Sequence, residues 1–90
     1  MTVEEFEAAG PERLSGALLA LWWDRQGNWQ TAHEIAQEID GAEGAWVHAY
    51  LHRKQGEAGN AAYWYRRAGR VEPSGDSGLE WAAMVRQLLG

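Results

Sequence analysis

Apolar residues recur at helical spacing along most of the chain, and the residues that interrupt this pattern divide it into helices. Thr2 and Glu5 have the spacing of a capping box, which predicts a short first helix that ends near Gly10. Pro11 suits the first turn of the next helix, because its missing N–H would have no partner there. We expect this second helix to continue to about Gln26.

Glycine-containing turns separate the helices that follow. Gly27 supplies a stop that tolerates positive φ, and Asn28 supplies an N-cap side chain, so the second and third helices should form a tight hairpin. Asp40 and Gly41 are expected to break the third helix, and Gly56 to end the fourth. The pattern predicts the third, fourth and fifth helices at about 29–39, 43–55 and 58–68.

The C-terminal part begins with a predicted loop over residues 71–76 and continues as a last helix over about 77–89. Ser77 and Glu80 have capping-box spacing, which predicts the start of this helix. We therefore predict an all-α fold and a single domain over residues 1–90. It consists of two antiparallel helical hairpins at about 11–39 and 43–69, a short N-terminal helix and a C-terminal capping helix.

The two predicted hairpins form a weak internal repeat with a period of 29 residues. Residues 26–29 (Gln-Gly-Asn-Trp) align with residues 55–58 (Gln-Gly-Glu-Ala), and Ala32 then aligns with Ala61. A Gly-polar turn followed by a small residue resembles the tetratricopeptide pattern, which implies helices that pack closely in pairs. The period is shorter than the 34 residues of that family, and a closing Pro between repeats is missing.

A second resemblance covers residues 44–54 (Gly-Ala-Trp-Val-His-Ala-Tyr-Leu-His-Arg-Lys) and residues 60–70 (Asn-Ala-Ala-Tyr-Trp-Tyr-Arg-Arg-Ala-Gly-Arg). These segments are similar to those of a family of short proteins of unknown function. The resemblance implies no activity and no site.

Composition excludes several classes of function. The net charge of −5 opposes the positive surface expected of a nucleic-acid-binding protein. The chain has no Cys, which excludes disulfides and thiolate chemistry. No apolar run approaches the roughly 20 residues that span a bilayer, and the acidic start is unlike a signal peptide. We expect a cytoplasmic protein with no membrane partner.

Histidines are the residues with the clearest potential for chemistry. His48 and His52 are one helical turn apart, a spacing with which two helical residues can bind one metal ion. A site would need a third ligand, from His33, Glu34, Asp24 or the acidic N-terminus.

The repeat alignment favours a different interpretation of these histidines. His48 aligns with Leu19 and His52 with Trp23, so both are expected to be partly buried. A buried imidazole needs a hydrogen-bonding partner. Structural histidines, each paired with a carboxylate, hydroxyl or carbonyl, are therefore the first interpretation, a polar binding pocket is the second and a metal site the third.

A group of aromatic and cationic residues in the fifth helix suggests a binding surface. Tyr63, Arg66, Arg67 and Arg70 are predicted to share a face that could hold an anion or a peptide carboxylate. The alternative is a solvated face whose arginines pair with nearby acidic residues.

Together these observations favour a non-enzymatic interaction module that binds a protein or peptide, in particular an acidic or C-terminal segment. Self-association is an alternative use of the same surface, because two hairpins are fewer than the three repeats that usually make a stable array. The alternative is a small metal-dependent or acid-base enzyme centred on His48 and His52. We assign no catalytic residue and no cofactor.

Overall fold

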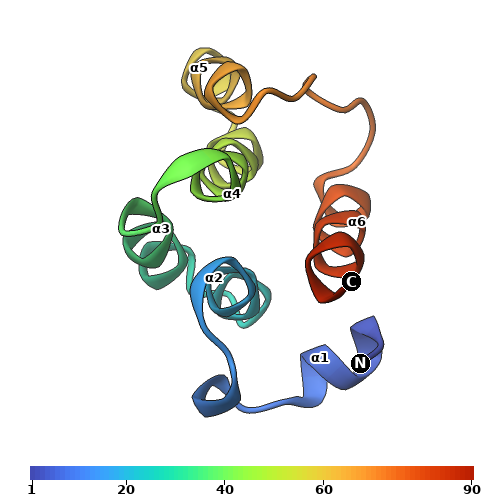
Figure 1. Ribbon diagram of the computed structural model, residues 1–90. Helices are drawn as coiled ribbons and strands as arrows, with labels where there is room; N and C mark the ends of the chain where they lie inside the picture. The colour runs from blue at the N-terminus through green and yellow to red at the C-terminus, as the bar shows by residue number, and fades with distance from the viewer.

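The computed structural model describes all 90 residues and contains helices and no strands, which confirms the predicted all-α class (Figure 1). The elements are α1 (Val3–Ala8), a 3₁₀ turn (Pro11–Arg13), α2 (Gly16–Arg25), α3 (Trp29–Gln37), α4 (Gly41–Lys54), α5 (Ala58–Ala68) and α6 (Ser77–Leu89).

Helices α2 to α5 follow one another side by side, and α6 lies beside α2 and α4, on the side away from α3 (Figure 1). Helix α2 packs on α3, α3 on α4 and α4 on α5. Helix α6 packs on α2 and α4, and α1 contacts both α2 and α6. The two chain termini therefore lie close together. Helix α5 packs on α4 and reaches α6 only through the Tyr65 hydroxyl, which donates to Glu80, so it forms the outer end of the stack.

Several predicted helix starts are confirmed. Thr2 and Glu5 form the capping box at α1, with the Thr2 hydroxyl accepting from the Glu5 N–H and the Glu5 carboxylate accepting from the Thr2 N–H. The Asn28 side chain accepts from the Thr31 N–H and caps α3. Local side-chain chemistry determines both starts.

Other boundaries differ from the prediction. Pro11 starts only a 3₁₀ turn, and α2 begins at Gly16. Helix α3 ends before Asp40, at Gln37 where 39 was predicted, and α4 begins at Gly41, with φ of 84°, where 43 was predicted. Helix α6 is capped by Asp76, whose carboxylate accepts from the Gly78 N–H, and Ser77 is already helical, so the capping box expected at Ser77 is wrong.

Helix α4 is the centre of the core. Every residue from Gly44 to His52 is buried, which places even its two histidines among neighbouring helices. Phe6, Leu21 and Trp81 extend this core to α1, α2 and α6. A helix buried on all sides in a small domain must contact elements on every face, and α4 contacts α2, α3, α5 and α6.

Buried hydrogen bonds hold α6 in place. The Trp81 indole N–H donates to the Leu21 carbonyl at 2.9 Å. Glu80 accepts from the Tyr65 hydroxyl at 2.6 Å and from the Arg53 guanidinium at 3.0 Å. These contacts join the last helix to three others. None of the six helices has the length and apolar character needed to cross a lipid bilayer.

Candidate metal centre

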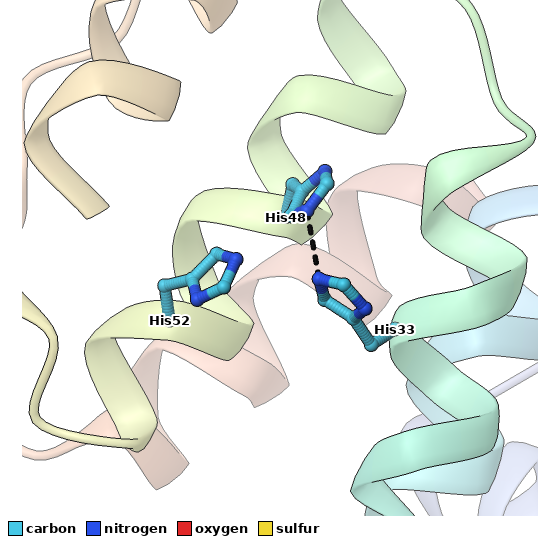
Figure 2. A group of neighbouring side chains, drawn as sticks. All are labelled: His33, His48 and His52. Carbon is cyan, nitrogen blue, oxygen red and sulfur yellow. Dashed lines mark hydrogen bonds between the residues drawn. The ribbon is translucent and has the colours of Figure 1, made fainter. Parts of the chain in front are cut away.

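All three histidines of the chain converge between α3 and α4 (Figure 2). One ring nitrogen from each of His33, His48 and His52 can be chosen so that the three lie within 4.8 Å of one another. His33 Nε2 and His48 Nε2 are 2.9 Å apart and share a hydrogen bond. The cluster therefore presents three nitrogen ligands around one small volume.

The geometry of the helices explains this convergence. His48 and His52 are one turn apart on α4, and their rings stack with centroids 5.0 Å apart. His33 comes from the neighbouring helix α3 and meets both rings edge-on, at 4.6 Å from His48 and 5.1 Å from His52. The predicted burial of His48 and His52 is confirmed, since 7% and 8% of their surfaces are exposed.

Glu57 provides a carboxylate behind one of the ligands. Its Oε1 lies 2.9 Å from His52 Nδ1. Glu57 is the N-cap residue of α5, yet its side chain makes no capping hydrogen bond. The carboxylate contacts His52 instead, and this contact leaves His52 Nε2 free to bind another group.

Two tryptophans cover the outer faces of the cluster. Trp29 stacks on His33 with centroids 4.8 Å apart, and its indole N–H donates to the Leu51 carbonyl at 2.9 Å. Trp64 stacks on His48 with centroids 4.0 Å apart. Both indoles restrict the rotation of the imidazoles and keep water from their faces.

The surroundings favour neutral imidazoles. Burial, followed by the charges of His33 and His52, lowers the pKa of His48 to about 4. Burial, followed by the charge of His52, also lowers the pKa of His33. A neutral imidazole has a lone pair available for a metal, so at neutral pH metal binding by His33 and His48 needs no net loss of a proton. The ring that donates their shared hydrogen bond must only move its proton from Nε2 to Nδ1.

The predicted acidic partners of the cluster lie elsewhere. Asp24 accepts from the Tyr50 hydroxyl at 2.5 Å and from the Lys54 ammonium at 2.9 Å, so it belongs to a separate buried network. Glu34 accepts only from Gln30, at 3.5 Å. Neither carboxylate is hydrogen-bonded to a histidine.

The tyrosine and the three arginines predicted to share one face of the fifth helix do not stay together, because Arg67 and Arg70 lie over different aromatic rings. Arg67 lies over Trp64 and Tyr63 and donates to the Tyr63 hydroxyl at 3.1 Å. Arg70 follows the left-handed residue that ends α5, and its guanidinium lies over the ring of Trp46 at 3.4 Å. Arg66 is exposed. The peptide-binding role of this group stays a prediction.

Glu57, Trp29 and Trp64 belong to the cluster but were not predicted from the sequence. A signal for Glu57 was present in the repeat, because Glu57 stands where the first hairpin has the capping residue Asn28. Glu is a weaker N-cap than Asn, so a Glu at that position indicates another use of the side chain.

Comparisons of the chain with models of protein families, with curated proteins and with solved structures find no match.

Proposed function

We propose that this protein binds a divalent transition-metal ion, such as zinc, through His33, His48 and His52. The observation that supports the proposal best is the convergence of the three ring nitrogens within 4.8 Å. Two nitrogens bound to one tetrahedral zinc ion are about 3.3 Å apart, given zinc–nitrogen bonds of about 2.0 Å. Ring rotations that move the nitrogens by about 1.5 Å or less would therefore complete the site.

Metal binding also gives a reason for placing three imidazoles together. In the metal-free protein, one of the Nε2 atoms of His33 and His48 must donate to the other. A metal ion would accept the lone pairs of both nitrogens and replace this single hydrogen bond with two coordinate bonds. Imidazole is a preferred ligand for zinc, copper and nickel, whereas magnesium and calcium prefer oxygen.

The contact between Glu57 and His52 supports the same proposal. A metal-bound histidine usually donates its second N–H to a carboxylate, a carbonyl or water, which fixes the ring and makes it a better ligand. Glu57 lies 2.9 Å from His52 Nδ1 and can accept that proton. Because this carboxylate is already engaged, Glu57 is a positioning residue, and we assign it no role in proton transfer to a substrate.

Three protein ligands leave one position of a tetrahedral ion open to water or another ligand, as in exchangeable and catalytic zinc sites. The proposed function is therefore reversible metal binding with an accessible coordination position. It differs from a structural zinc site, which the protein fills with four ligands.

The test is a titration of untagged protein with zinc, measured by isothermal calorimetry after a chelator has removed any bound metal. We expect one ion per chain. Replacement of one ligand in His33→Gln, His48→Gln or His52→Gln should weaken binding by about tenfold or more, because two ligands remain. Cobalt should give the intense visible absorption of a tetrahedral site.

Glu38→Gln is the matched control, since Glu38 is an exposed carboxylate that is not part of the cluster. Circular dichroism of each variant shows whether its helices are intact. Absence of zinc, copper and nickel binding by the folded wild-type protein would refute the proposal. Equal zinc affinity in the wild type and all three histidine variants would refute the assigned ligands.

A further inference from the structure

A cavity of about 430 Å³ lies behind His48, between the end of α3, the first turns of α4 and helix α5. The indole of Trp64 and several small residues, Ala45 among them, form an apolar wall. Gln37, His48 and Arg67 contribute polar groups. Asp40 is the one acidic residue in the lining. The cavity thus combines an apolar surface with the polar side chains of Gln37, His48 and Arg67.

The second nitrogen of His48 is free to face this cavity. Trp64 and His52 stack on the two faces of the ring, and Nε2 faces His33. Nδ1 has no hydrogen-bonding partner in the protein. Every fully buried side-chain nitrogen or oxygen does have one, so Nδ1 is accessible to solvent, and His48 is one of the residues that line the cavity. Figure 2 shows this nitrogen pointing away from the other two imidazoles.

Metal binding would determine what Nδ1 presents to the cavity. With the metal on Nε2, the proton of the neutral His48 ring must reside on Nδ1, which then becomes a hydrogen-bond donor. The corresponding proton of His52 has Glu57 as its acceptor. His48 has no such acceptor in this chain, although metal-bound histidines usually have one.

Arg67 makes the opening attractive to an anion. It lines the cavity, forms no ion pair with any carboxylate of the chain, and has one N–H bonded to the Tyr63 hydroxyl. A guanidinium has five N–H donors, so several remain available. The planar arrangement of these donors matches a carboxylate.

We infer that the cavity binds a small monocarboxylate with an apolar substituent. One carboxylate oxygen accepts from His48 Nδ1–H, Arg67 pairs with the anion, and the substituent packs on Trp64 and Ala45. Asp40 repels anions, and this repulsion is larger for a doubly charged phosphate than for a monocarboxylate. This inference rests on the proposed metal site, because the metal fixes the proton on Nδ1.

The ligand and the metal should then strengthen each other's binding. A carboxylate on Nδ1–H increases the basicity of the imidazole toward the metal, as Glu57 does for His52. Linkage requires that the metal increase carboxylate affinity by the same factor. We expect saturating benzoate to increase zinc affinity by about three- to tenfold.

The experiment consists of two calorimetric titrations of the untagged protein. In the first, zinc is titrated into the protein in the absence and in the presence of benzoate. In the second, benzoate is titrated into the metal-free and the zinc-loaded protein. Both titrations should give the same coupling factor. In Arg67→Gln the coupling should be lost, whereas Arg66→Gln, whose arginine is exposed and does not line the cavity, should retain it. Asp40→Asn should tighten benzoate binding, since the repelling charge is removed.

Each outcome has a distinct meaning. Zinc binding without any benzoate effect would overturn the carboxylate inference and leave the proposed metal site standing, whereas absence of zinc binding would overturn both. Coupling that persists in Arg67→Gln would mean that benzoate binds directly to the metal, which also overturns the inference. Stronger coupling to inorganic phosphate than to benzoate would overturn the choice of ligand class.

Discussion

Metal-free protein should lose stability when the pH is lowered from about 7.5 to about 5, with His48 as the main cause. Burial and the neighbouring imidazoles hold the pKa of His48 at about 4 in the folded protein, against an ordinary value of 6.5. Between these two values the unfolded chain binds a proton at this residue and the folded protein does not. The free energy of unfolding therefore falls as the pH falls through this interval.

The magnitude follows from the two pKa values. At about pH 5, protonation stabilises the unfolded chain by about 2 kcal/mol relative to the folded protein, and at about pH 7.5 the effect is close to zero. The pKa of His33 is lowered as well, so it contributes in the same direction.

Urea denaturation followed by circular dichroism at the two pH values measures this loss. A slope of about 1 kcal/mol per molar urea, as expected for a small domain, converts it to a fall of about 2 M in the midpoint. His48→Gln should remove most of the pH dependence. Because each variant is compared with itself at the two pH values, any constant cost of the substitution cancels.

Glu38→Gln, on the exposed surface of the same domain, should show the wild-type pH dependence. Wild-type protein with equal midpoints at both pH values would refute the reasoning. So would His48→Gln with an undiminished loss, because the proton would then be binding somewhere else.

Three further predictions concern the partners of the site and the core. Glu57→Ala should lower zinc affinity by about 10- to 100-fold in calorimetry with the helical signal unchanged; unchanged affinity would exclude a positioning role. Trp81→Phe should cost about 1–3 kcal/mol in urea denaturation, because the buried Leu21 carbonyl loses its donor; a cost near zero would mean that this hydrogen bond is dispensable. Glu80→Ala should cost about 1–3 kcal/mol by the same measurement, because the buried Tyr65 hydroxyl loses its acceptor while Arg53 keeps Glu72 and the Gly75 carbonyl; a cost near zero would indicate that water replaces the carboxylate.

The sequence by itself determined the helices and most of their ends. The apolar spacing and the caps at Thr2 and Asn28 act within a few residues of chain, so they can be recognised without knowledge of the fold. The prediction failed at the start of α2 and at the cap of α6, where several polar or glycine residues in succession offered competing local structures. The repeat alignment also placed His48 and His52 at buried positions.

Only the tertiary structure decided which side chains form the candidate metal centre. The spacing of His48 and His52 follows from a single helix, but the position of His33 depends on how α3 packs on α4. Glu57, the N-cap residue of α5, is only five residues after His52, so the tight turn between α4 and α5 brings its carboxylate to that ring. The tertiary structure removes Asp24 from the cluster, because Asp24 is bonded to Tyr50 and Lys54. Helical periodicity assigns residues to faces of one helix, whereas a metal site requires the distances between atoms on different helices, and packing alone determines these distances.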